Sequence, residues 1–149
     1  MGECFNGNTD YVAPYQEAVS GLFNYPMFFT IKDVFGSGQS MYKIRERFDE
    51  EVAKFKDVDA LGIFVDNHDN ARFQNQFHND KHFKSALTFA LTARGIPFYY
   101  YGSEQDFNGG NDPENRETLW GSMNTNSDIY QMTKKINAAR KAHQVWNHP

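Results

Sequence analysis

The chain has 149 residues, of which 40% are hydrophobic and 16% aromatic, so it can form one domain with a substantial core and is not a disordered tail. Its formal net charge of −4 and the lack of a basic block argue against a nucleic-acid partner, because affinity for nucleic acids comes mainly from neutralised phosphates. No apolar run approaches the roughly 20 residues that span a bilayer, and no membrane partner is expected. Met1 is followed at once by Gly2 and Glu3, so no amino-terminal signal sequence is expected, and the single cysteine, Cys4, excludes an internal disulfide.

The first 40 residues show a weak alternation of short strands and helices. A short strand is predicted to end at Glu3, and a helix is predicted over residues 14–22. A brief strand over residues 23–25 and a further helix over residues 28–35 follow. This part therefore predicts two strand–helix units.

The middle of the chain has clearer periodicity. Apolar residues recur three and four apart over residues 41–55 with charged residues between them, which predicts an amphipathic helix. The continuous apolar run over residues 61–65 predicts a strand buried on both faces. A second helix is predicted to be capped by Asn79 or Asp80 and to stop near Gly95, with Pro97 just beyond it.

The last part repeats the pattern once more. A strand is predicted over residues 96–101, and a long loop rich in Gly, Asn and Asp extends to about residue 126. The final helix is predicted to present one apolar face, made of Ile129, Met132, Ile136 and Ala139. The order of strand and then helix thus occurs four times.

This alternation indicates parallel strands joined by right-handed crossovers, hence an α/β fold with its site beyond the carboxyl ends of the strands. Four units could form a small open sheet, or they could be half of an eight-stranded barrel, which needs about 250 residues when complete. The barrel is favoured because polar residues follow every predicted strand, namely Glu3, Asn24, His68, Asp69, Glu104 and Gln105.

The strand over residues 61–65 leads directly into Asn67, His68 and Asp69. Two adjacent titratable groups after a buried strand are costly without a use, so His68 and Asp69 are candidates for catalysis or binding. The simpler alternative is a polar pair that caps the next turn. His78 and His82 are four apart, as metal ligands on one helix are, but no third ligand is evident, and solvated histidines at a helix amino-terminus are expected.

Three segments together resemble a known family. FVDNHDNARF at 64–73, GIPFYYYGSEQDFNGGNDPENRETLW at 95–120 and GECFNG at 2–7 resemble the carboxyl-terminal half of the catalytic barrel of the α-amylase family, most like fungal-type α-amylases. The resemblance covers nearly the whole chain, and the order and spacing of the segments make it specific. It implies a partial (β/α)8 TIM barrel over residues 1–149, comprising strands five to eight with their helices.

The resemblance also implies a chemistry, namely retaining hydrolysis of α-1,4-glucan such as starch or glycogen, with two carboxyl groups about 5 to 5.5 Å apart. Glu3 matches the family's general acid/base. Asp69 matches the third carboxylate, which stabilises the oxocarbenium-like transition state, and His68 matches the histidine that hydrogen-bonds ring hydroxyls. Asp112 and Arg116 match residues that hold a more distant glucose unit, although a simple salt bridge is the alternative. The motifs do not separate hydrolysis from glycosyl transfer.

The chain departs from the family pattern at the nucleophile, an Asp in a strand that reads roughly G-x-R-x-D. The one R-x-D here is Arg47-Phe48-Asp49, in the middle of the predicted amphipathic helix, where a solvated face is expected. The nucleophile-bearing half and the carboxyl-terminal β-sandwich are therefore expected to be absent, and the isolated chain to be inactive. Calcium is expected in the full-length enzyme, with no cofactor within this chain. Relatives are commonly secreted, but the compartment stays open.

A second hypothesis is a non-catalytic half-barrel that binds glucan or a protein partner. It is the less favoured one, because a half-barrel leaves unpaired edges at the strands that carry Glu3 and Tyr99, and such edges promote association. Tyr99, Tyr100 and Tyr101 are expected to pack within their strand, with one phenol reaching the site.

Overall fold

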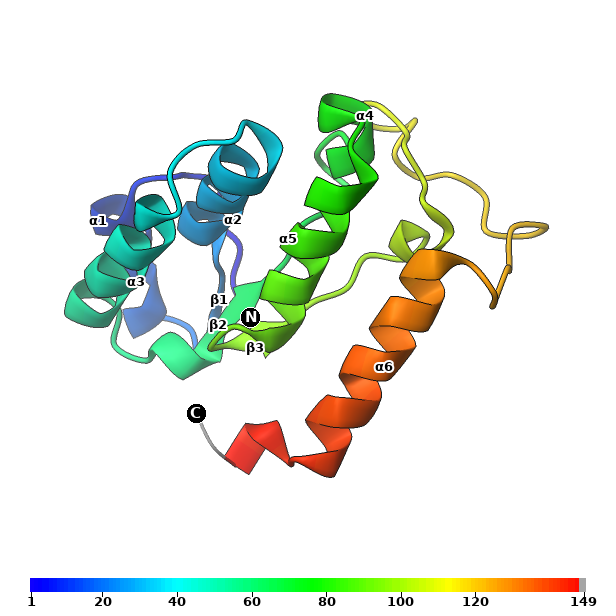
Figure 1. Cartoon of the computed structure of the whole chain (residues 1–149). Helices are drawn as coiled ribbons and strands as arrows, with labels where there is room; N and C mark the ends of the chain where they lie inside the picture. Colours follow the sequence, from blue (N-terminus) through cyan, green and yellow to red (C-terminus); the bar gives the residue numbers. More distant parts are fainter. Residues whose placement is uncertain (148–149) are drawn as a thin grey trace.

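The computed structural model describes residues 1–147 and shows an α/β fold with one parallel sheet (Figure 1). The strands β1 (Leu22–Phe23), β2 (Leu61–Ile63) and β3 (Ile96–Pro97) lie in chain order. Leu22 pairs with Leu61, and Gly62 pairs with Ile96. The predicted strand before Glu3 is reduced to a single parallel bridge between Gly2 and Leu22. The predicted α/β class is confirmed: neighbouring strands are parallel, and their order in the sheet is their order in the chain.

The amino-terminal helices differ from the prediction. The helix predicted over residues 14–22 is wrong, because α1 (Thr9–Val12) and the 3₁₀ helix η1 (Ala13–Glu17) occupy this region and Leu22 is already in β1. The next helix, α2 (Tyr25–Ile31), begins three residues before the predicted position, since the Asn24 side chain accepts a hydrogen bond from Met27 N and caps it. A π-helical turn, η2 (Lys32–Gly36), continues it.

Three longer helices agree with the prediction. They are α3 (Tyr42–Lys54), α5 (Asp80–Thr92), which Asn79 caps as expected, and α6 (Asp128–Ala142). The predicted apolar face of α6 is only partly covered: Ile129 is buried, Met132 and Ile136 are half-buried, and Ala139 is exposed. The remaining short helices are η3 (Val58–Ala60), α4 (Phe73–Phe77), η4 (Ser103–Gln105) and η5 (Val145–Asn147).

The strands predicted over residues 61–65 and 96–101 are both shorter in the structure. Phe64 and Val65 are buried as expected but lie outside β2. The strand predicted over residues 96–101 ends at Pro97, and its last link to the sheet is the Phe98 N–H, which donates to Ile63 O at 2.7 Å. Beyond this point the tyrosines turn to the loop that follows, where the Tyr101 hydroxyl donates to Glu117 O.

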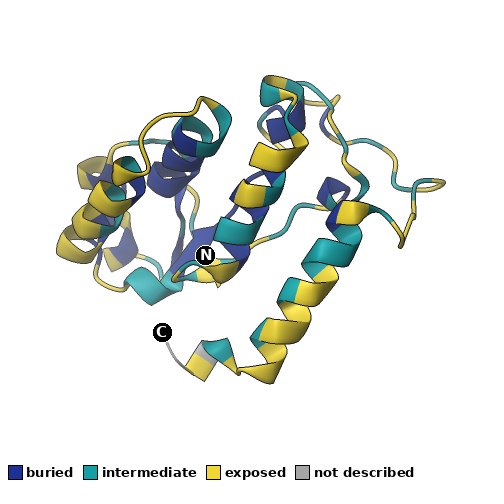
Figure 2. Cartoon of the chain, in the orientation of Figure 1, coloured by how far each residue is buried: buried dark blue, intermediate teal, exposed yellow. Residues whose placement is uncertain are grey.

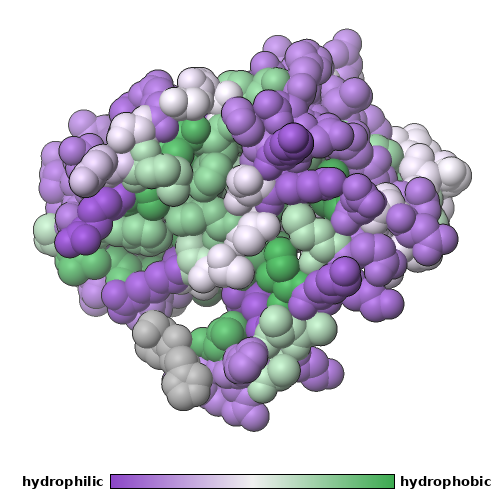
Figure 3. Space-filling model, viewed as in Figure 1, coloured by the Kyte–Doolittle hydropathy of each residue, from purple (hydrophilic) through white to green (hydrophobic). Residues whose placement is uncertain are grey.

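The core lies between the sheet and the helices α2 and α5. Its largest cluster includes Met27 and Ile31 of α2, Ile63 of β2, and Phe83 and Ala86 of α5. Figure 2 shows this buried layer and the exposed outer faces of α3 and α6. The face seen in Figure 3 has apolar side chains gathered between the regions of α3 and α5, with hydrophilic ones around them. Of the helices in the described part of the chain, none is long and apolar enough to cross a membrane.

Candidate active site

A cavity of about 170 Å³ lies at the carboxyl ends of the three strands. Each strand contributes one phenylalanine to its lining, because Phe23 ends β1, Phe64 follows β2 and Phe98 follows β3. The ring centroid of Phe23 is 4.7 Å from that of Phe98. The polar part of the lining consists of Glu3, Asp66, Asn67, His68, Tyr99 and Tyr100. Parallel α/β sheets hold their chemistry in this position, so the cavity is the candidate active site.

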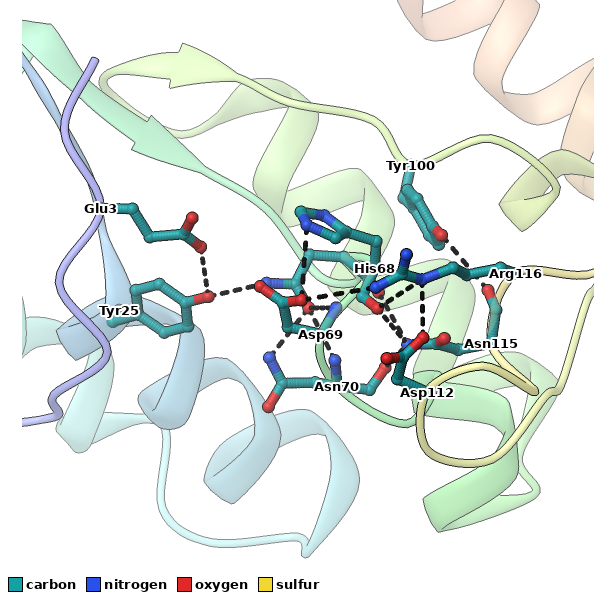
Figure 4. Close-up of polar contacts among 10 residues, drawn as sticks. Glu3, Tyr25, His68, Asp69, Asn70, Tyr100, Asp112, Asn115 and Arg116 are labelled. Carbon is teal, nitrogen blue, oxygen red and sulfur yellow. Dashed lines mark hydrogen bonds and ion pairs between the residues drawn. The ribbon is translucent and has the colours of Figure 1, made fainter.

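Two predicted residues from distant parts of the sequence, Glu3 and His68, line this one cavity. The Tyr25 hydroxyl donates a hydrogen bond to Glu3 Oε1 at 2.6 Å, and Asn67 Nδ2 donates to the same hydroxyl at 2.7 Å (Figure 4). Burial, with the nearby Glu3 carboxylate, raises the pKa of Tyr25 well above its usual range, so this phenol stays protonated. Tyr25 therefore links the Glu3 carboxylate to Asn67 in the turn that follows β2.

The other predicted residues form a chain of charged side chains beside His68. His68 Nε2 lies 3.4 Å from Asp69 Oδ1, and Arg116 Nη2 lies 3.8 Å from the same oxygen. Arg116 Nε also pairs with Asp112 Oδ1 at 2.8 Å, so the alternative of a salt bridge is realised, and this bridge places the guanidinium near Asp69. These side chains are about half exposed, so the ion pairs add little stability and the groups stay accessible to a ligand.

The sequence reasoning missed Asn115, which holds this group of residues together. Its side chain is fully buried, and Nδ2 donates to His68 O at 2.8 Å and to Asn70 O at 2.9 Å. The turn that carries Asp69 is therefore fastened to the loop that carries Arg116. Nothing in the sequence signalled this role, because an Asn in a loop rich in Gly, Asn and Asp usually serves a local turn.

Comparison with known proteins decides the family. The family model described as alpha amylase, catalytic domain, matches residues 1–148. The chain belongs to the α-amylase catalytic-domain family. The resemblance inferred from the three sequence segments is thus confirmed.

Individual α-amylases match nearly all of the chain. A beta/alpha-amylase of Paenibacillus polymyxa is 43% identical, over 96% of this chain and 12% of that protein. An α-amylase of Saccharomycopsis fibuligera is 38% identical, over 95% of this chain and 29% of that protein. The solved structure of an α-amylase from Malbranchea cinnamomea is 34% identical with a TM-score of 0.91, over 98% of this chain and 31% of that one. The chain therefore spans less than a third of the length of each of these three relatives.

Behind the exposed residues, this α-amylase-family chain has a buried carboxylate, Asp66, which was not predicted. Its oxygens accept hydrogen bonds from the Phe73 backbone N–H at 2.7 Å and from the Ser103 hydroxyl at 3.1 Å. Burial raises the pKa of Asp66, and burial lowers that of the nearby Lys32 to about 8. Asp66 ties the amino-terminus of α4 to η4 and is itself part of the cavity wall.

A second buried group of the α-amylase-family chain, also missed, is Arg72. Its Nε donates to Glu117 Oε2 at 2.7 Å, and the other oxygen of Glu117 accepts from Gly109 N. The guanidinium lies over the ring of Tyr100, 4.4 Å from the centroid. Arg72 thus clamps both ends of the loop that carries Asp112 and Arg116.

The three tyrosines of the α-amylase-family chain are divided between packing and the site. Tyr99 and Tyr100 line the cavity, and burial raises the pKa of each to about 12. The Tyr99 hydroxyl pairs with Thr133 of α6, and the Tyr100 hydroxyl donates to Asn115 O. The prediction that these tyrosines pack within a strand is wrong, because β3 ends before them. One tyrosine was expected to reach the site, and two of them, Tyr99 and Tyr100, line the cavity.

Two further predictions can be compared with the structure. His78 is the left-handed residue that ends α4, whereas His82 lies in α5, so the two histidines do not share a helix. Within residues 1–147, no group of three His, Cys, Asp or Glu side chains could hold a metal ion. Arg47 and Asp49 lie on α3 as predicted, but Arg47 is more buried than a solvated residue, since it donates to Thr30.

Proposed function

We propose that this chain supplies the acid/base side of the active site of a retaining α-amylase-type glycoside hydrolase that acts on α-1,4-glucan such as starch or glycogen. In this proposal residues 1–149 are strands five to eight of a (β/α)8 barrel with their helices. The observation that carries it is the meeting of Glu3 and His68 in one cavity, with Asp69 beside His68. A carboxylic acid and a second carboxylate near one pocket are the components of glycoside hydrolysis.

Each residue has a role in the proposed reaction. Glu3 protonates the glycosidic oxygen and later takes a proton from water. Asp69 stabilises the positive charge that develops on the sugar ring, and His68 hydrogen-bonds the ring hydroxyls. Arg116, held by Asp112, binds a glucose unit further along the glucan, where its planar guanidinium offers fixed donors to hydroxyls.

The names of the relatives support the substrate class, because the matching proteins from Paenibacillus, Saccharomycopsis and Malbranchea are amylases. The nucleophile is proposed to come from residues outside this chain, since the single R-x-D lies on α3 with Arg45 paired to Asp49 at 2.9 Å. We therefore expect the isolated 149-residue chain not to hydrolyse starch. Calcium in the full-length enzyme remains a prediction, with its ligands outside this chain.

The proposal is tested with a chimera. Residues 1–149 replace the matching 31% of the Malbranchea α-amylase, and release of reducing sugar from soluble starch is measured. We expect turnover that Glu3→Gln lowers by at least about a thousandfold and that Glu46→Gln, an exposed change on α3, leaves unchanged.

The same assay on the isolated chain is expected to give no turnover. A folded chimera without activity would contradict the proposed function. Measurable binding of maltoheptaose by the isolated chain, together with an inactive chimera, would favour the glucan-binding half-barrel in its place.

A further inference from the structure

We propose that Tyr25 is a positioning residue that determines which oxygen of Glu3 carries the acidic proton. It does so at the end of a one-directional hydrogen-bond chain that starts in the turn carrying Asp69. The inference rests on the proposed function, in which Glu3 is the general acid. The residues in this chain are Asn70, Asn67, Tyr25 and Glu3 (Figure 4).

The direction of the chain is fixed at Asn67. Its side-chain oxygen Oδ1 accepts from the Asn70 backbone N–H at 3.1 Å, from Asn70 Nδ2 at 2.8 Å and from the Asp69 N–H at 3.3 Å. Backbone N–H groups are donors only, so reversing the amide would place its NH₂ against other donors. The Asn67 amide nitrogen must therefore face Tyr25.

The next step fixes the hydrogen of the phenol. Asn67 Nδ2 donates to the Tyr25 oxygen at 2.7 Å, so the single hydroxyl hydrogen is left for Glu3 Oε1, which lies 2.6 Å away. Burial keeps the phenol protonated, since it raises the pKa of Tyr25 well above the usual range. The ring itself is held by edge-on contacts with the rings of Phe5 at 5.0 Å and Phe64 at 5.2 Å between centroids.

The last step concerns the position of the proton on the Glu3 carboxyl group. Oε1 of Glu3 accepts from Tyr25, and the carbonyl oxygen of a neutral carboxyl group is a better acceptor than its hydroxyl oxygen, so the acidic proton belongs on Oε2. In the proposed reaction this proton moves from Oε2 to the glycosidic oxygen, which keeps the electron pair of the broken bond to the anomeric carbon. The resulting carboxylate remains hydrogen-bonded to Tyr25, and one oxygen thus acts as the acid while the other stays anchored.

The first test uses Tyr25→Phe, which keeps the ring and removes only the hydroxyl, in the chimera with the Malbranchea α-amylase. We expect kcat on maltoheptaose to fall about tenfold with KM little changed, because the carboxyl group loses the anchor that holds it in place; sharing the proton between two oxygens would by itself cost only about twofold. The alkaline limb of the kcat profile should move to higher pH, since the ionised carboxylate loses a donor. Tyr130→Phe on α6 is the matched control, and its profile should equal that of the parent.

A second measurement needs no turnover. In the 149-residue chain, proton NMR should show a slowly exchanging Tyr25 hydroxyl signal that Tyr25→Phe removes and Glu3→Gln moves upfield. An active chimera whose alkaline limb is unmoved by Tyr25→Phe, or a hydroxyl signal indifferent to Glu3→Gln, would overturn the inference. An inactive parent chimera with the expected hydroxyl signals would instead overturn the proposed function and leave the direction of the hydrogen bonds standing.

Discussion

Asn115 Nδ2 lies 2.8 Å from the carbonyl oxygen of His68, although the two residues are 47 positions apart in the chain. The same nitrogen also donates to Asn70 O at 2.9 Å, and the Asn115 side chain is fully buried. The carbonyl groups on both sides of Asp69 are thereby satisfied from a loop that itself carries Asp112 and Arg116. The turn that carries Asp69 and the loop that carries Arg116 must move together, because neither can shift without breaking buried hydrogen bonds.

Asn115→Asp tests this coupling, because it replaces the donating NH₂ by an oxygen that faces two carbonyl groups. We expect the chain to lose about 3 kcal/mol of unfolding free energy, through buried acceptors left without a donor. Urea unfolding followed by circular dichroism measures the change. Asn126→Asp, an exposed site in the same loop region, is the control and should lie within about 0.5 kcal/mol of the parent. Equal stability of the two variants would refute the role of Asn115.

Arg72 offers a second prediction, because its guanidinium is fully buried and pairs with Glu117. Arg72→Met should lower the unfolding free energy by about 3 to 5 kcal/mol, since it leaves the Glu117 carboxylate without its cation. Arg72→Met combined with Glu117→Gln should recover part of this loss, because the uncompensated charge is removed. Arg45→Met removes an exposed ion pair with Asp49 and should cost less than about 1 kcal/mol. A double variant no more stable than Arg72→Met alone would contradict the explanation.

The candidate residues at the surface of the site could be named from the sequence, whereas the residues that hold them could not. His68 and Asp69 follow an apolar run, so their position follows from strand geometry, whereas Glu3 follows only Met1 and Gly2 and was named from the resemblance of its segment alone. Tyr25 could not be placed in the same way, because it lies in an apolar segment where a phenol resembles core. Its partners come from two other strand ends, and only the tertiary arrangement brings these together.

The errors in the elements have a related cause. Asn24 was assigned to a strand, since its neighbours are apolar, but its side chain caps α2 and ends β1. The run of aromatic residues after Pro97 has a high intrinsic preference for strands, yet β3 ends at Pro97 and the hydroxyl groups of Tyr100 and Tyr101 donate to Asn115 O and Glu117 O. In both places a long-range hydrogen bond or a cap outweighed local preference.

Glu51 of α3 predicts how stability depends on pH. It is 2% exposed, its carboxylate accepts a hydrogen bond from Asn24, and burial raises its pKa from 4.5 to about 7 despite this bond and the nearby Arg47. A carboxyl group with a raised pKa in the folded state stabilises the fold at low pH, and this stabilisation is lost as the pH rises. The unfolding free energy should therefore fall by about 3 kcal/mol between about pH 4.5 and 7 on account of Glu51.

The measurement is a series of urea titrations across this pH range. Glu51→Gln should make the slope shallower, because a neutral amide cannot ionise on unfolding. The slope that remains is assigned to Asp66, whose pKa burial also raises. Glu46→Gln, an exposed change on the same helix, should leave the slope unaltered. A parent chain whose stability rises over this range would show that Glu51 is not a buried acid.

The outer side of β3 predicts how the isolated chain associates. Ile96 pairs with Gly62 of β2 on one side, its side chain is 42% exposed, and β3 is the last strand of the described sheet. An open parallel edge with an apolar side chain promotes pairing with another copy, so the 149-residue chain should dimerise or aggregate at micromolar concentration.

Ile96→Lys should lower the sedimenting mass, because a charge at the edge must be buried on pairing. Val52→Lys adds the same charge on an exposed face of α3 and should not. If both variants sediment like the parent, association does not occur through this edge, and a monomeric parent that melts cooperatively would remove the prediction altogether.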